Sequence, residues 1–182
     1  MKKIINIVVL QFILILIISV SAFAEGGMSI KIGDKAPDFK LKKFNSDETV
    51  SLVDYKGKKN VLIQFWATWC AICKREIPFL VNHYNANKAK GDFEILAILL
   101  PAGEGDKEKV EKLIEKYNIP YPILIDADTK VATEKYGLTG LIPVIAVIDK
   151  DGILQYDHVG ELSSTDDPIP FWLDDLRGVE ED

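Results

Sequence analysis

The chain has 182 residues, which is enough for one well-packed domain and short for two. Its hydrophobic and charged shares, 48% and 27%, are those of an ordinary globular protein. The net charge of −6, together with a sequence that has no basic block or stripe, excludes nucleic acid as the main partner.

The N-terminal segment has the pattern of an export signal. A short basic region, "MKK", precedes an apolar run over residues 4–20, and "AFA" at 22–24 has the small-x-small pattern of a cleavage site. We interpret residues 1–24 as a secretory signal peptide. An uncleaved membrane anchor is the alternative, because the apolar run approaches the ~20 residues that a spanning helix needs. Either interpretation predicts that the rest of the chain lies outside the cytoplasm.

The next segments predict a leader and an extended start to the domain. Residues 25–30 are expected to be a flexible leader. The stretch "KIGDKAPDFKL" (31–41) is expected to be extended, and Pro37 excludes it from the centre of a sheet. Residues 48–59 alternate between apolar and polar side chains and then turn at Lys56-Gly57.

Two continuous apolar runs, residues 60–67 and 93–100, predict strands that are buried on both faces. A helix is expected between them, from about Cys70 to Lys90. Pro78 should kink this helix and Gly91 should end it. The residues predicted to form its buried stripe are Ile72, Ile77, Leu80, Val81 and Tyr84.

The second half of the chain alternates between helices and strands in the same way. Its predicted elements are a helix within 101–120, a strand at 121–126, a short helix ended by Gly137, a hairpin of strands at 143–149 and 153–160, and a last helix from Asp166 to Gly178. Residues 179–182 should fray. Strands that alternate with helices predict a single α/β domain with a central sheet, over residues 31–178.

Cys70 and Cys73 are the only cysteines in the chain. A disulfide across so short a loop would constrain the unfolded state weakly, so a stapling role explains the pair poorly. Cys70 directly follows a predicted buried strand and opens a helix, where free N–H groups stabilise a thiolate and lower a cysteine pKa from ~8.5 to ~3.5–7.5. We therefore predict that Cys70 is the attacking sulfur. Cys73, one turn later on the same face, would resolve the mixed disulfide.

The stretch "FWATWCAICKREIP" (65–78) resembles the active site of thioredoxin-like proteins, and the exported TlpA/ResA-like branch more than cytoplasmic thioredoxin. Trp69, the C-x-x-C pair, Lys74 and Pro78 carry the resemblance, which extends over about 31–163. It implies a thioredoxin fold: a central mixed β-sheet flanked by helices, with an N-terminal extension and a β-α insertion. It also implies that the protein is an enzyme, a thiol-disulfide oxidoreductase.

The same resemblance assigns further residues to the site. Pro143 matches the family's cis-proline, and Ile142 before it would contact the bound partner, as would Trp69 at the edge of the site. Thioredoxin has a buried acid where this chain has Gln64, which cannot take a proton. In ResA-like proteins a glutamate after the next strand tunes the cysteines, and Glu104 matches it; a solvated charge in the first turn of a helix is the alternative for Glu104.

From this resemblance we expect an exported reductant that acts on disulfide-containing client proteins, with apocytochrome c as the typical client and a membrane thiol transporter as the electron donor. No cofactor beyond the cysteine pair, no metal and a monomeric state are expected. The motif does not determine the direction of electron flow.

Three alternatives stay open at this point. The cysteines could bind copper or zinc together with His83 or His158, although a second closely spaced ligand pair is missing from the sequence. Peroxiredoxins share the "GDKAPDF" opening, but Ala67 occupies the place of the threonine that precedes their reactive cysteine. A binding module without redox chemistry is the third.

Lys74 and Arg75 could stabilise a thiolate or form an exposed helix face.

Overall fold

The computed structural model describes residues 27–101, 103 and 105–179. The predicted signal peptide at 1–24 and the predicted tuning residue Glu104 lie outside the described residues. None of the helices within the described part of the chain combines the length and the apolar character needed to cross a bilayer.

The described strands form one seven-stranded mixed sheet in the order β2-β1-β5-β4-β3-β6-β7. Strands β3, β4 and β5 are parallel, whereas β6 is antiparallel to β3 and β7 to β6. Strand β1 is antiparallel to both of its neighbours. The strands are β1 (Lys40–Lys43), β2 (Thr49–Ser51), β3 (Asn60–Trp66), β4 (Phe93–Leu99), β5 (Ile123–Ile125), β6 (Val144–Ile148) and β7 (Leu154–Val159).

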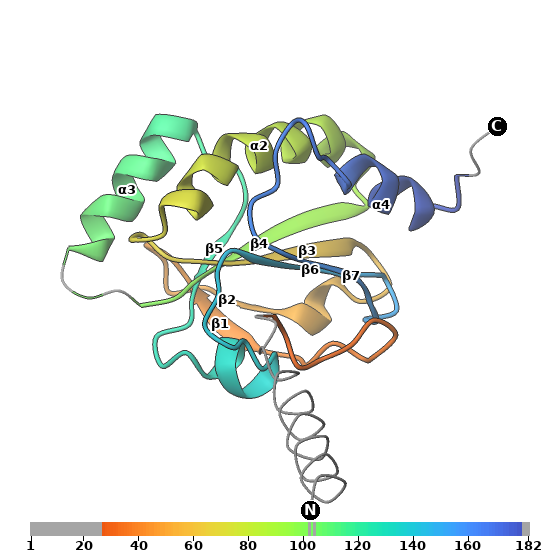
Figure 1. Cartoon of the computed structure of the whole chain (residues 1–182), viewed down its shortest axis with the longest axis horizontal. Coiled ribbons are helices and arrows are strands. Elements are labelled where there is room, and N and C mark those ends of the chain that lie inside the picture. Colours follow the sequence, from red (N-terminus) through yellow and green to blue (C-terminus); the bar gives the residue numbers. More distant parts are fainter. Residues whose placement is uncertain (1–26, 102, 104, 180–182) are drawn as a thin grey trace, which may run out of the picture.

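Helices cover both faces of this sheet. Figure 1 shows α2, α3 and α4 on one side, with the short helix η3 on the other. The helices are η1 (Leu52–Tyr55), α2 (Ala71–Asn87), η2 (Lys88–Lys90), α3 (Asp106–Tyr117), η3 (Val131–Lys135, a single π-helical turn) and α4 (Ile169–Asp175). This arrangement confirms the predicted α/β class and the predicted thioredoxin fold.

Strands β3 and β4 lie in the middle of the sheet. All of their residues are buried, as their continuous apolar runs predicted. Side chains of alternate residues enter two separate cores. Leu62 and Trp66 face α2 and α4, while Ile63 and Phe65 face η1 and η3. Strand β3 packs against a core on each face of the sheet and is held firmly between them. Cys70 follows the end of β3 by four residues, so this strand positions the cysteine pair.

Helix α2 and the short helix η2 together match the predicted helix, which ends at Gly91 in the left-handed region with φ +72°. Pro78 lies inside α2. The buried stripe differs from the prediction at Ile72, which is 39% exposed. Ile72 lies in the first turn at the rim of the domain, where no element covers it. Glu76, a polar residue, is buried in the stripe instead.

The segment Gly27–Ile30, which the sequence predicts to be part of a flexible leader, contacts the folded domain. The amide of Ser29 donates to the carbonyl of Tyr136 at 3.0 Å, and Met28 and Ile30 pack against the core on the η3 side of the sheet. The tail predicted at 179–182 lies outside the described residues except for Val179, whose amide donates to the carbonyl of Asp174 at 3.0 Å.

Candidate active site

Cys70 and Cys73 form a disulfide at the start of α2, with 5.3 Å between their Cα atoms. Cys70 is the N-cap residue of the helix, and the amide of Cys73 donates to the Cys70 sulfur at 3.1 Å. This amide is one of the free N–H groups of the first helical turn, so it would stabilise negative charge on Cys70 when the bond is reduced.

Both cysteine residues are buried, and they differ only slightly in exposure. Cys70 is 6% exposed and Cys73 is completely buried. The slightly greater exposure of Cys70 fits the predicted order, in which a partner reacts first with Cys70 and Cys73 then resolves the mixed disulfide.

The Ile142–Pro143 peptide bond is cis, as the resemblance implied. It lies beside the disulfide: the carbonyl oxygen of Ile142 is 3.8 Å from the Cys70 sulfur. Pro143 directly precedes β6, which pairs with β3, so the sheet positions this loop next to the end of the strand that leads to Cys70.

The two tryptophans of the motif have different environments. Trp66 is buried in the core that faces α2, and Trp69 is 61% exposed. Trp69 lines a shallow pocket of about 230 Å³ together with Leu100, Leu141 and Ile142. Leu141 is also largely exposed, at 56%. Exposed apolar side chains beside a reactive sulfur favour contact with a protein partner.

Glu76 is the buried acid that the sequence interpretation missed. It lies one turn after Cys73 on α2 and has no exposed surface. The amide of Leu162 donates to one carboxylate oxygen at 2.9 Å, and the side-chain amide of Gln64 donates to the other. Gln64 thus occupies the strand position of thioredoxin's acid but serves as a donor to an acid on the facing helix.

The carboxyl of Glu76 titrates near neutrality. Burial raises its pKa from 4.5 to about 7, although the hydrogen bonds from Leu162 and Gln64 act in the opposite direction. A carboxyl with this pKa can accept or release a proton at physiological pH, one turn from the buried sulfur. The signal in the sequence was an acid placed within the apolar stripe formed by Cys73, Ile77 and Leu80.

Arg75, two residues after Cys73, forms an ion pair at the surface. Arg75 forms a two-pronged ion pair with Glu161, with nitrogen–oxygen distances of 2.9 and 2.7 Å. Its guanidinium is therefore held by the segment that follows β7. This contact favours the second of the two interpretations of Arg75, an exposed helix face.

The two histidines lie apart from each other, on α2 and β7. The ring of His83 is 3.0 Å from a carboxylate oxygen of Asp167, and it packs against Phe79. His158 on β7 is half-buried. Within the described ranges, no three His, Cys, Asp or Glu side chains gather as a metal-binding group.

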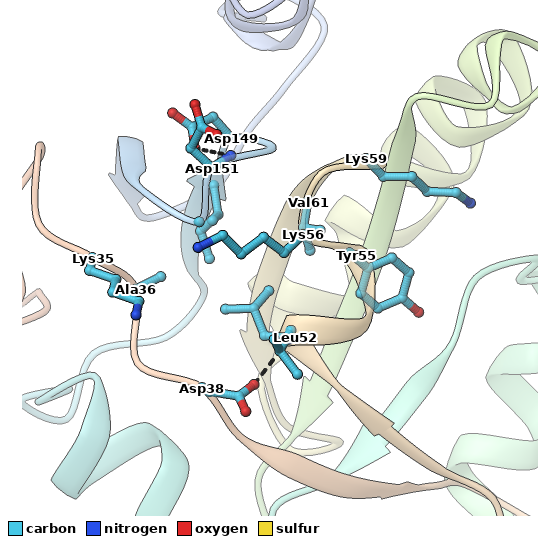
Figure 2. Close-up of a pocket in the computed structure, with 13 residues that line it drawn as sticks. Lys35, Ala36, Asp38, Leu52, Tyr55, Lys56, Lys59, Val61, Asp149 and Asp151 are labelled. Carbon is cyan, nitrogen blue, oxygen red and sulfur yellow. Dashed lines mark hydrogen bonds between the residues drawn. The ribbon is translucent and has the colours of Figure 1, made fainter.

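A second pocket, of about 270 Å³, lies at the opposite end of β3 from the disulfide (Figure 2). Leu52 and Val61 form part of its apolar wall, and Lys56 extends across it. The carboxylate of Asp38 accepts a hydrogen bond from the amide of Val53 and so joins the segment before β1 to η1. The carboxylate of Asp149 accepts one from the amide of Asp151 and holds a local turn. This pocket contributes nothing to the redox site.

A disulfide between cysteines three residues apart at a helix start and a neighbouring cis-proline loop on this fold define a thiol-disulfide oxidoreductase. The comparisons with known proteins agree. The chain is 36% identical over 138 residues to the thiol-disulfide oxidoreductase ResA of Geobacillus thermodenitrificans, covering 76% of this chain and 75% of the relative. It is 32% identical to the thioredoxin-like protein YneN of Bacillus subtilis, over 78% and 79% of the two chains.

A solved structure of a thiol:disulfide interchange protein from a Bacteroides species has the same fold. The TM-score is 0.65 at 29% sequence identity, over 85% of this chain and 95% of that one. A model of the AhpC/TSA family matches residues 32–157, and the chain belongs to this family. The predicted resemblance to ResA-like oxidoreductases is confirmed, and the protein is a redox enzyme of that type.

Proposed function

We propose that this protein is an exported reductant of disulfides in extracytoplasmic client proteins. The observation that carries the proposal is the Cys70–Cys73 pair at a helix start, with the Ile142 carbonyl 3.8 Å from the Cys70 sulfur. Glu76, a buried carboxyl whose pKa burial raises to about 7, follows Cys73 by one helical turn. The proposal that the protein is exported rests on the basic and apolar sequence pattern of residues 1–24.

The reaction begins with the Cys70 thiolate, which attacks one sulfur of the client disulfide. A bond forms between Cys70 and the client, the client disulfide breaks, and the second client sulfur leaves as a thiolate that takes up a proton. Extended client backbone beside the attacked cysteine would pair with Ile142, and Trp69 would contact client side chains.

Cys73 completes the cycle. Its thiol must lose a proton inside the protein, and the Glu76 carboxylate, one turn away, is the base that the fold offers. The Cys73 sulfur then attacks Cys70, the mixed disulfide breaks, and the client leaves with its second thiol. Two electrons have passed from the dithiol to the client. No cofactor takes part in this scheme.

We further propose the haem-binding cysteines of apocytochrome c as clients, a membrane thiol transporter as the source of electrons, and a monomeric enzyme. The resemblance to ResA-like proteins supports all three. Glu104 remains a predicted tuning residue.

The reduction potential of the Cys70–Cys73 pair against glutathione tests the direction of the reaction. A value at or below about −250 mV fits a reductant, while a value near the ~−120 mV of a strong oxidant would reverse the direction. Deletion of the gene should impair attachment of c-type haem, and normal attachment would exclude that client. Hydrogen peroxide serves as a control substrate, since rapid turnover at micromolar peroxide would indicate a peroxidase.

A further inference from the structure

The segment Gly27–Ile30, which we call the leader clamp, is bound to the chain just before the Ile142–Pro143 loop. The amide of Thr139 donates to the carbonyl of Gly27 at 3.1 Å, and the amide of Gly27 donates to the Thr139 hydroxyl at 3.2 Å. The amide of Ser29 donates to the carbonyl of Tyr136 at 3.0 Å. These hydrogen bonds join residues more than a hundred positions apart in the sequence.

Gly137 allows the leader clamp to lie this close. Its φ is +64°, and a Cβ atom built there would lie 1.9 Å from the hydroxyl oxygen of Ser29 and 2.5 Å from its Cβ. Any side chain at position 137 would therefore displace Ser29. A Cβ on Gly27 would in turn meet Val159 at 3.6 Å, so the leader clamp also lies next to the end of β7.

Hydrogen bonds hold the loop Gly140–Pro143 at both of its ends. Thr139, just before it, is bound by Gly27, and the carbonyl of Pro143 accepts the amide of Gly160, which follows β7, at 3.0 Å. Between these two points the loop carries Ile142, whose carbonyl is 3.8 Å from the Cys70 sulfur. The leader clamp thus contacts the frame of the loop that faces the disulfide, without contacting the cysteines.

We propose that the leader clamp is a positioning element for client binding: it holds the Gly140–Pro143 loop in the shape that accepts a client backbone. The inference rests on the proposed role of Ile142 and Pro143 in binding clients. A loop that loses this support must be ordered when the client binds, which weakens binding without changing the chemistry at sulfur. Protein disulfides depend on the leader clamp, whereas small disulfides that need no backbone pairing do not.

The test uses the full chain with Gly137→Ala, which pushes Ser29 away, and with Thr139→Val, which keeps the side-chain shape and removes the hydroxyl. The substrates are a disulfide-bonded peptide with a C-x-x-C-H sequence and bis(2-hydroxyethyl) disulfide. Each variant should raise KM for the peptide about threefold to tenfold, the effect of one or two lost hydrogen bonds. The kcat for the peptide, the rate with the small disulfide and the reduction potential should stay at wild-type values.

Gly91→Ala is the matched control. Gly91 has φ +72°, close to that of Gly137, but a Cβ there meets nothing within 4 Å. The Gly91→Ala substitution also places alanine at a positive φ, so it should cost a similar amount of folding free energy and leave the KM for the peptide unchanged. Should Gly137→Ala fail to fold, Thr139→Val decides the question.

Two results would overturn the inference. One is a wild-type peptide KM in folded Gly137→Ala and Thr139→Val; the other is an equal loss with both substrates, which would indicate a general structural defect. Neither result bears on the proposed function, which is tested separately by the reduction potential and by whether the wild-type enzyme reduces the peptide.

Discussion

Replacing Glu76 by glutamine should remove a pH dependence from the stability of the fold. Burial raises the pKa of this carboxyl from 4.5 to about 7, so the folded protein binds its proton more tightly than the unfolded chain does. Between these two pH values the unfolded chain has released a proton that the folded protein keeps. The free energy of unfolding therefore falls as the pH rises through this window.

The size of the effect follows from the shift. One pKa unit corresponds to ~1.36 kcal/mol, and a carboxyl whose pKa moves from 4.5 to about 7 lowers the free energy of unfolding by about 2.5 kcal/mol between pH 5 and pH 8. Glutamine has a similar volume and keeps an acceptor for the Leu162 amide, but it has no proton to lose. This contribution should disappear in Glu76→Gln.

Urea unfolding of the oxidised wild type and Glu76→Gln at pH 5 and pH 8 measures the effect, because the disulfide keeps both cysteines out of the titration. From pH 5 to pH 8 the wild type should lose about 2.5 kcal/mol more than the variant. Asp128→Asn is a suitable control: Lys130 lowers the pKa of Asp128, so the contribution of Asp128 is lost only below pH 5. Equal pH dependence in wild type and Glu76→Gln would refute the assignment of Glu76 as a neutral-range acid.

Three further predictions concern the disulfide, its rim and the C-terminal helix. Cys70→Ser should abolish disulfide reduction, whereas Cys73→Ser should trap a covalent adduct with the client, visible on a non-reducing gel; turnover by Cys70→Ser would contradict the order of attack. Trp69→Ala should raise KM for a peptide disulfide and leave the reduction potential unchanged, with a stability change within about 0.5 kcal/mol, because the side chain is 61% exposed. Arg177→Ala should lower the free energy of unfolding by about 2 kcal/mol in urea titrations, since its guanidinium donates two hydrogen bonds to Asp92, at 2.9 and 3.0 Å. An unchanged unfolding midpoint would show that this ion pair contributes nothing.

Most of the fold could be predicted because its signals are local. The apolar runs that became β3 and β4 and the C-x-x-C pair at the start of α2 each lie within one element. Periodicity and turn residues are properties of neighbouring positions, so they can be recognised without knowledge of the partner elements. Ile72 shows the limit of this reasoning, because its spacing fits a buried stripe but nothing in the fold covers it.

The proposed proton acceptor, Glu76, could not be assigned in the same way. In the sequence, Glu76 is one position of a helical pattern. Only the folded protein places Gln64 and the Leu162 amide against its carboxylate. The partner amide lies 86 residues further along the chain. Burial, which shifts the pKa, is a property of the packed elements together rather than of the helix.

By itself, the sequence determined the class of the fold and the position of the cysteine pair at a helix start, because these depend on residues close together in the chain. It also led to the prediction that Cys70 is the attacking sulfur. The tertiary structure alone decided which acid is buried near Cys73, how near Ile142 lies to Cys70, and that Gly27 binds Thr139. Each of these depends on contacts between distant segments, and such contacts exist only once the sheet and its helices have packed.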